Sequence, residues 1–397
     1  MNILYIDPGT GSLIISLIIA ALISLKNFFI NSYYELKSLI TNKNYKRKVN
    51  FSEDLVFFSE GEKYWNVFQP VIKELFKKKQ KVIYLTAENS DPGLKINSEF
   101  IESYYIGNMN DALVFLNKLK AKFLVSTTPQ LDIFSWKYTK NIRHYCYINH
   151  SPVDIHSYKK FAFDYYDSIL CTSEFQITNL IELEKKRESK KKTLLKTGCT
   201  YYDIEREIKY TNKEFILLAP TWGERSFFSK SGISIIEKLL KANFDIVYRP
   251  HPQSFLTEKK LIESIELKFG ENEKFKIDKS TDNFETLSRS SILITDISSG
   301  MIYDSIFKFN IPVIAVDFNW YDGSYESSDL ETISSTKLLI NEYGKVISAE
   351  EDFKVDEVVM SINNKNFSYE NIDKYIFNYK KASRIACNQI LELFNNI

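Results

Sequence analysis

Arginine and histidine side chains gather in two short segments, each directly after an apolar run. Arg249 and His251 alternate with prolines in residues 248–252 (YRPHP), and His150 and Asp154 lie in residues 148–156 (INHSPVDIH). An arginine can bind an anion through two parallel hydrogen bonds, and a neutral imidazole can accept a hydroxyl proton near neutral pH. We predict an anion site at the first segment, where His251 can donate a proton, and a general base at the second, with Asp154 orienting His150. The alternative is that each histidine is structural.

A third segment with chemical potential is residues 295–300 (TDISSG), between an apolar run and an expected helix. Backbone N–H groups and the positive end of a helix dipole at such a junction favour a phosphate, and two hydroxyls add donors. Simple capping of the helix explains the same residues without a ligand. Residues 219–223 (APTWG) follow another apolar run and either line the same pocket or form a plain turn. The candidate residues for binding a nucleotide and its phosphates here are Asp296, Ser298, Ser299, Gly300 and Thr221.

The surrounding pattern alternates short apolar strands with amphipathic helices, which indicates α/β domains with doubly wound, mostly parallel sheets. We expect strands at 55–58, 81–85, 123–126, 145–148, 168–171, 215–219, 245–248, 292–295 and 312–316. We expect helices at 65–75, 113–119 and 235–240, one starting at Gly300, and a closing helix at 375–394. Ligands of open α/β sheets bind beyond the carboxyl ends of the strands, where all the segments above lie.

A charged stretch at 203–214 divides this pattern into two similar halves. We predict a Rossmann-like acceptor-side domain at 34–205 and a Rossmann-like donor-nucleotide domain at 206–397, with a cleft between them. Residues 215–318 carry the nucleotide-binding part of the second domain.

The composition excludes several other classes. A net charge of +1 over 397 residues, without a basic groove sequence, gives no reason to expect nucleic acid binding. The four cysteines are widely spaced and fit a reducing compartment better than a zinc site or disulfides. Asp-x-Asp is absent from the chain. We therefore expect no metal site.

The N-terminus carries an apolar run at 13–25, and no charged residue occurs from Pro8 to Leu25. We predict a membrane anchor at 1–33, although the run is at the short end of the roughly 17 to 25 residues that a span needs. Lysines and an arginine follow it at 26–48, which places the remaining chain in the cytoplasm by the positive-inside rule. A buried core helix or an interfacial segment is the alternative.

Several motifs, taken in order, resemble the CDP-glycerol glycerophosphotransferases of teichoic-acid and related surface-polymer synthesis, which have the two-domain GT-B fold. They are residues 57–60 (FFSE), 91–94 (DPGL), 150–152 (HSP), 219–222 (APTW), 249–252 (RPHP), 295–299 (TDISS) and 312–314 (PVI). The resemblance implies attack by a hydroxyl of a lipid-linked acceptor on the β-phosphorus of a CDP-alditol such as CDP-glycerol, with release of CMP and no cofactor or obligatory metal.

Carried over by motif, His150 would be the base, and Arg249, His251, Ser298 and Ser299 would neutralise the pyrophosphate. One departure is residues 198–200 (GCT), where many relatives have Gly-Tyr-Pro, and this leaves open how that region contacts a ligand.

Two other functions fit the same pattern. A GT-B glycosyltransferase or sugar-nucleotide epimerase uses the same fold, and fold alone does not decide chemistry. A non-catalytic, membrane-tethered nucleotide-binding scaffold belongs to a different class and predicts donor binding without turnover. The leaving group separates the two enzymes, since CMP leaves in phosphodiester formation and a nucleoside diphosphate in glycosyl transfer.

Overall fold

The structure is a computed structural model that describes residues 50–206, 213–228, 233–280, 282–317, 323–349, 353–363 and 372–397. The predicted anchor at 1–33 lies outside these residues. Within the described ranges, no helix has both the length and the apolar character needed to cross a membrane.

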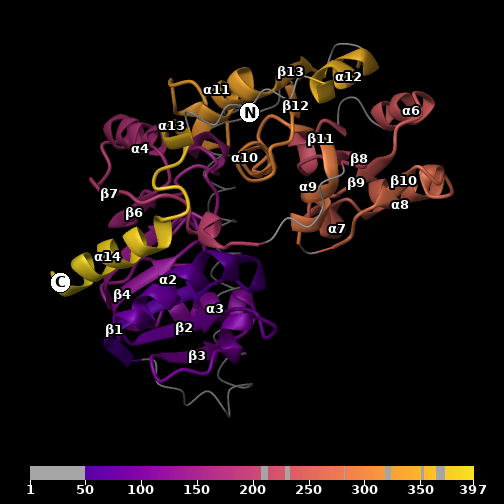
Figure 1. Ribbon diagram of the computed structural model, residues 1–397. Helices are drawn as coiled ribbons and strands as arrows, with labels where there is room; N and C mark the ends of the chain where they lie inside the picture. The colour runs from indigo at the N-terminus through magenta and orange to yellow at the C-terminus, as the bar shows by residue number, and fades with distance from the viewer. Residues whose placement is uncertain are drawn as a thin grey trace, which may run out of the picture. The chain divides into compact units, whose positions relative to one another are not determined.

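Thirteen strands in the described residues form two sheets (Figure 1). The first has the order β3-β2-β1-β4-β5-β6-β7 and the second β10-β9-β8-β11-β12-β13. Every pair for which the register is defined is parallel. The strands are β1 Asn50–Ser59, β2 Val82–Thr86, β3 Ile101–Tyr105, β4 Lys120–Ser126, β5 Ile142–Ile148, β6 Ser168–Cys171, β7 Thr193–Lys196, β8 Phe215–Ala219, β9 Ile246–Tyr248, β10 Phe275–Ile277, β11 Ser290–Asp296, β12 Val313–Asp317 and β13 Lys345–Ser348.

Helices connect these strands, as parallel pairing requires. They are α2 Trp65–Lys77, α3 Met109–Leu116, α4 Glu174–Arg187, α6 Ser234–Lys241, α7 Ser254–Thr257, α8 Lys259–Phe269, α9 Phe284–Arg289, α10 Met301–Tyr303, α11 Ser335–Tyr343, α12 Val355–Asn363, α13 Ile372–Tyr375 and α14 Ala382–Asn395. A π-helical turn at Asp304–Lys308 continues α10. The predicted doubly wound parallel α/β class is confirmed.

The chain divides into two compact units. Unit 1 contains the described residues up to Ile148, together with Phe163–Ser168 and Ile390–Ile397. Its core is the buried strand β1 flanked by β2 and β4, with the apolar face of α2 packed against it. Unit 2 contains Asn149–Ala162 and Ile169–Gln389, and so includes the His150 segment as well as the second sheet. The predicted domain ranges 34–205 and 206–397 stay a prediction.

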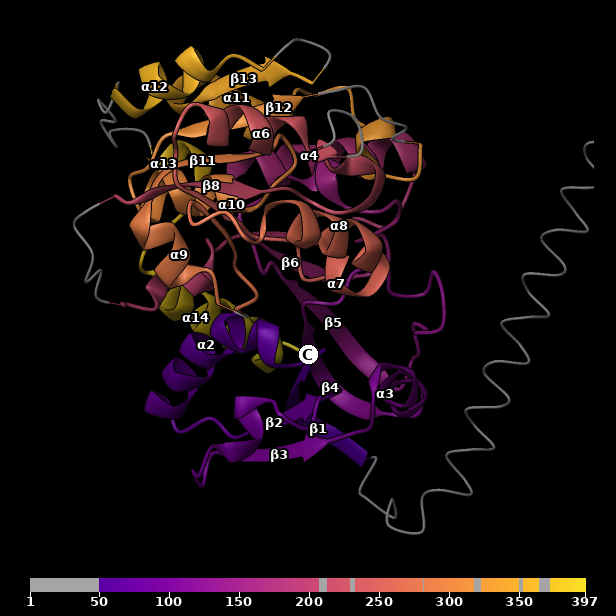
Figure 2. The ribbon, with the colours of Figure 1, turned by 90° about the vertical axis from the view of Figure 1, so that its right-hand side faces the viewer.

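The second sheet is covered on both faces, which explains its almost wholly apolar strands. Helices α6 and α8 (Figure 2) lie on one face. They bury Ile236, Leu239 and Ile265 against it. Helices α9 and α11 and the helical turns 301–308 bury Leu287, Ile302 and other apolar residues against the opposite face. The carboxyl ends of the strands are therefore the open edge where loops can reach a ligand.

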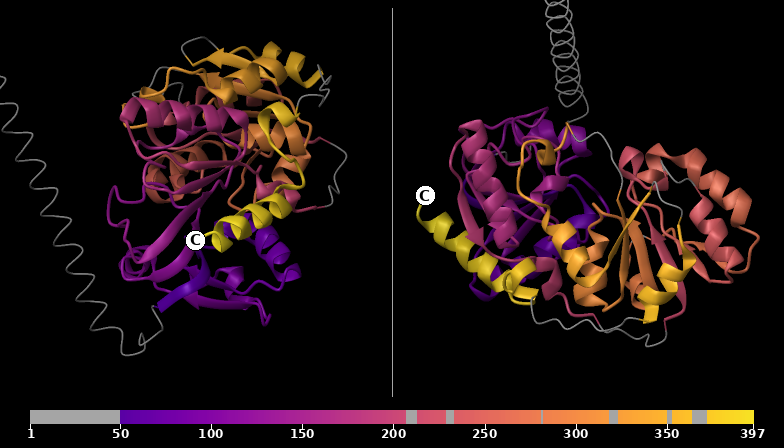
Figure 3. Two further views of the ribbon diagram at one scale, coloured as in Figure 1. Left: turned by 90° about the vertical axis from the view of Figure 1, so that its left-hand side faces the viewer. Right: turned by 90° about the horizontal axis from the view of Figure 1, so that it is seen from above.

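The predicted closing helix is wrong in its first turns. The long helix α14, which ends the chain (Figure 3), begins at Ala382 rather than at residue 375. Asn378 and Lys380 have φ values of +47° and +60°, a left-handed conformation that interrupts a right-handed helix. Asp203 then accepts hydrogen bonds from the backbone N–H groups of Ala382 and Ser383, as an N-terminal cap does.

Candidate functional site

Three loops of unit 2 meet at the carboxyl ends of the adjacent strands β9, β8 and β11. Trp222, after β8, has its ring centroid 6.3 Å from that of His251, after β9. Thr221 donates its backbone N–H to the Asp296 carboxylate at the end of β11 at 2.5 Å, and its hydroxyl at 3.0 Å. The strand order thus brings together residues that lie 29 and 75 positions apart in the sequence.

Asp296 organises these loops. Its side chain is 1% exposed, and besides Thr221 it accepts a hydrogen bond from the backbone N–H of Phe227. A buried carboxylate needs such donors, because burial without them is costly. The predicted donor-site residue Asp296 therefore holds the loop after β8 in place through these hydrogen bonds.

The turn at 297–300 follows Asp296 directly. The Ser299 side chain is buried, and its hydroxyl accepts a hydrogen bond from the backbone N–H of Met301 at 3.3 Å, so it caps the following helical turns. Ser298 is half-buried. Within the described residues, Ser298 makes no hydrogen bond to another side chain. The Ser299 hydroxyl thus serves the turn itself, and a phosphate contact of Ser298 stays a prediction.

Gly300 places the turn against the His150 loop. A Cβ atom at Gly300 would lie 3.3 Å from the Ser151 Oγ and 3.5 Å from the Val153 Cγ2. A side chain larger than hydrogen would therefore press on the residues that follow His150. The predicted base and the predicted phosphate-binding turn lie on segments that are in contact within unit 2.

The Arg249 guanidinium is held by residues at the end of β10. It forms an ion pair with Asp278 and donates to the Ser280 hydroxyl and to the Ser280 carbonyl, both at 3.0 Å. Burial alone would raise the pKa of the Asp278 carboxyl, but hydrogen bonds from Ser280 and Thr286 and the charge of Arg249 hold it below its usual value. Within the described residues, Arg249 has no hydrogen bond to Ser298 or Ser299. The predicted anion ligand is thus buried and fixed in orientation by a carboxylate.

His251 has a defined tautomer. Its Nδ1 accepts the backbone N–H of Gln253 at 3.1 Å, which requires a lone pair on Nδ1. A neutral ring then carries its proton on Nε2. A donor role of the His251 Nε2–H toward an anion stays a prediction.

His150 is half-buried, with its ring centroid 6.1 Å from that of Tyr158 in an edge-on arrangement. Asp154 accepts hydrogen bonds at the start of α11, from the Ser334 hydroxyl at 2.5 Å and the Ser335 hydroxyl at 3.3 Å. Its other oxygen lies 3.8 Å from the Nδ1 of His156. Asp154 therefore anchors the His150 loop to the start of α11, and its role as the orienter of His150 stays a prediction.

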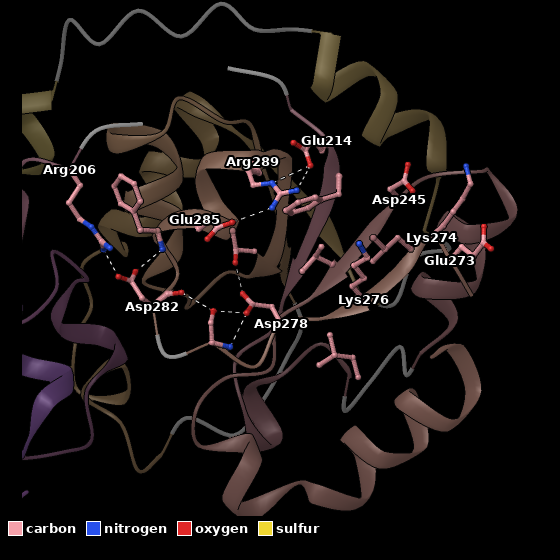
Figure 4. A pocket seen from close by; sticks show the side chains of 17 residues that line it. Arg206, Glu214, Asp245, Glu273, Lys274, Lys276, Asp278, Asp282, Glu285 and Arg289 are labelled. Carbon is pink, nitrogen blue, oxygen red and sulfur yellow. Dashed lines mark hydrogen bonds and ion pairs between the residues drawn. The ribbon is translucent and has the colours of Figure 1, made fainter. Parts of the chain in front are cut away.

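A pocket of about 1040 Å³ lies beside the partners of Arg249 (Figure 4). Its lining runs from the amino ends of β8 and β9, along β10, to α9, and it includes Asp278 and Ser280, together with carboxylates and cations such as Asp282 and Arg206. None of the predicted site residues lines it. Among the residues that the structure describes, no group of His, Cys, Asp or Glu has the arrangement needed to hold a metal.

Sequence reasoning missed the partners that fix the site. Asp278 directly follows β10, which has only three residues with a central lysine and so lacks the apolar signal of a strand. An acid directly after an edge strand beside an arginine-bearing strand end is the signal that could have found it. The serines and threonine at 334–336 carry no comparable signal, because they meet Asp154 only through the tertiary fold.

The site stands on a GT-B-type fold, with two parallel Rossmann-like sheets and loops at the carboxyl ends of the strands. The wall teichoic acid polymerase TagF has a similar structure, with 15% identity, coverage of 94% of this chain and 98% of that one, and a TM-score of 0.50. UDP-GlcNAc 2-epimerase from Methanocaldococcus jannaschii, in complex with UDP-GlcNAc and UDP, has 13% identity, 88% and 100% coverage, and a TM-score of 0.57.

S. aureus MnaA, in a structure with UDP, has 16% identity, 87% and 97% coverage, and a TM-score of 0.56. No protein-family model matches the chain. A search of curated proteins also finds no match. At these identities the likeness establishes the fold alone.

Proposed function

We propose that this chain is a membrane-associated transferase that moves glycerol phosphate, or another alditol phosphate, from a CDP-activated donor to a hydroxyl of a lipid-linked acceptor. The observation that carries the proposal is the packing of the His150 loop against Gly300, since it puts the proposed base on a segment next to the proposed phosphate-binding turn. The fold likeness to the polymerase TagF and the ordered motifs support the same chemistry.

The residues divide the reaction between them. His150 takes the proton of the acceptor hydroxyl as its oxygen forms a bond to the β-phosphorus, and the bond to the bridging oxygen breaks to release CMP. His251, with its Nε2–H, and Arg249 stabilise the charge on the phosphate oxygens, as fixed dipoles and cations do in phosphoryl transfer. Ser298 and backbone N–H groups of the turn add further donors.

A second candidate is a GT-B glycosyltransferase or a UDP-GlcNAc 2-epimerase. It is favoured by the TM-score of 0.57 to the epimerase from M. jannaschii, which exceeds the 0.50 to TagF. A non-catalytic nucleotide-binding scaffold is the third. It predicts donor binding without turnover.

The deciding experiment incubates the full chain in lipid nanodiscs with CDP-glycerol or CDP-ribitol and lipid-linked acceptors, and measures CMP by chromatography. UDP-GlcNAc in parallel reactions tests for UDP release and for epimerised product. Acceptor-dependent CMP release supports the proposal. Failure to release CMP from every CDP-alditol, or turnover of UDP-GlcNAc alone, overturns it.

A further inference from the structure

The loop that carries His150 is bound to a distant stretch of unit 2. Lys159 pairs with Tyr325 in an antiparallel β-bridge. Two backbone hydrogen bonds, of 2.8 and 3.0 Å, form this bridge. We call these paired segments, residues 158–162 and 324–329, the clasp. It fixes the far end of the His150 loop.

Buried charges lock the clasp. The Glu326 carboxylate is 0% exposed, accepts the backbone N–H of Ala162 at 2.9 Å and forms an ion pair with Arg187 of α4. The same guanidinium binds Asp329 at 2.7 Å. Buried charges must be paired, so both segments have to take up this arrangement for the charges to be satisfied. None of these residues has a role in the proposed reaction.

Tyr158 connects the clasp to the base. Its carbonyl accepts the backbone N–H of Glu326 at 2.8 Å, and its ring meets the His150 ring edge-on with centroids 6.1 Å apart and planes at 71°. Its hydroxyl lies 3.4 Å from the Oδ1 of Asn149, and the Asn149 side chain in turn donates to the Leu170 carbonyl at 3.0 Å. A continuous set of contacts thus runs from the buried ion pairs to the imidazole and to the residue before it.

We propose that the clasp positions the His150 imidazole through Tyr158, which makes Tyr158 and Glu326 positioning residues for the transfer step. This inference rests on the proposed function, in which His150 is the base. Tyr158 packs on the His150 ring, whereas Arg249 is held by Asp278 and Ser280 at the end of β10, so we expect loosening Tyr158 to change the proton-accepting step and to leave donor binding intact.

The test compares the full-length wild type with Tyr158→Ala, Tyr158→Phe and Glu326→Gln, with Glu214→Gln as a control that alters an exposed arginine–glutamate pair elsewhere in unit 2. CMP release gives kcat, calorimetry gives the Kd of CDP-glycerol, and 15N-histidine NMR reports the His150 ring. The chain has only four histidines, so His150→Gln assigns the resonance.

We expect Tyr158→Ala to lower kcat at least tenfold with the donor Kd within about twofold, since a misplacement of about 1 Å can cost about 100-fold. Tyr158→Phe keeps the ring contact, so its kcat should stay within about threefold of the wild-type value. The kcat of Glu326→Gln should lie between those of Tyr158→Ala and Tyr158→Phe. The His150 resonance should shift or broaden in Tyr158→Ala while the His251 resonance does not change.

If kcat and the His150 resonance are both unchanged in Tyr158→Ala, the clasp does not position the His150 ring. A proportional loss of kcat and donor affinity would also contradict the proposal. If Tyr158→Ala fails to fold, Tyr158→Phe and Glu326→Gln decide on the same readouts. If the wild type releases no CMP, the proposed function fails. The His150 resonance then tests by itself whether the clasp positions the His150 ring.

Discussion

At the residue scale, the proposed function gives His150 and Arg249 separable roles. We expect His150→Ala to lower CMP release about 10²- to 10⁴-fold with little change in donor affinity, because a general base contributes that much to the rate. Arg249→Ala should instead weaken CDP-glycerol binding, and Arg249→Lys should not restore it, because a lysine cannot form the two-pronged contact. Single-turnover kinetics and calorimetry on both variants measure the two effects. Equal loss of rate and affinity in both variants would contradict this division.

The Arg249–Asp278 pair gives stability a defined dependence on pH. The folded-state pKa of Asp278 is lowered, so its contribution is complete above the unfolded-state pKa of about 3.9 and is lost as pH falls through the folded-state pKa. We expect Asp278→Asn to destabilise the protein by about 1–3 kcal/mol at pH 7, since a hydrogen-bonded charge is removed.

Urea unfolding at pH 7 and pH 3 tests the Asp278 prediction. The difference in the free energy of unfolding between wild type and Asp278→Asn should be larger at pH 7 than at pH 3. A gap that stays constant or widens toward acid pH would show that Asp278 does not stabilise the fold through its charge.

At the element scale, Asp296 makes β11 the support of the loop after β8. We expect Asp296→Asn to lower the free energy of unfolding by about 2–4 kcal/mol, because an amide turns one acceptor into a donor facing a backbone N–H. Donor affinity should fall with it, since Thr221 and Trp222 lose their support. Thermal unfolding and CDP-glycerol titration measure both. Asp317→Asn, another acid at the end of a strand but partly exposed, is the control and should change neither. Donor binding at wild-type strength in Asp296→Asn would refute the support role.

The strands and helices show how far sequence reaches. Buried runs such as 215–219 and 292–295 predicted β8 and β11, because strands covered on both faces must be apolar throughout. Edge strands β3, β7, β10 and β13 were missed, since half-exposed strands carry charged or polar residues such as Lys276. The motif loops were found because their strand ends converge by topology. Their actual partners, Asp278 for Arg249 and residues 334–336 for Asp154, depend on tertiary packing that spacing does not encode.

At the scale of the whole molecule, we propose that residues 1–33 hold the catalytic units at the cytoplasmic membrane face, where a lipid-linked acceptor is found. Arginine at the centre of a span costs about 2.5–3.5 kcal/mol per residue, so the double variant Ile18→Arg/Leu22→Arg should detach the chain from membranes. Flotation through a density gradient measures the detached fraction. Leu267→Arg, on a side chain that is 89% exposed in α8, is the control and should float like the wild type.

The detached variant should keep its affinity for CDP-glycerol and lose transfer to lipid-linked acceptors, because only the local concentration of acceptor has changed. If the double variant floats as the wild type does, the run at 13–25 is not the anchor, and a buried or interfacial helix explains it instead.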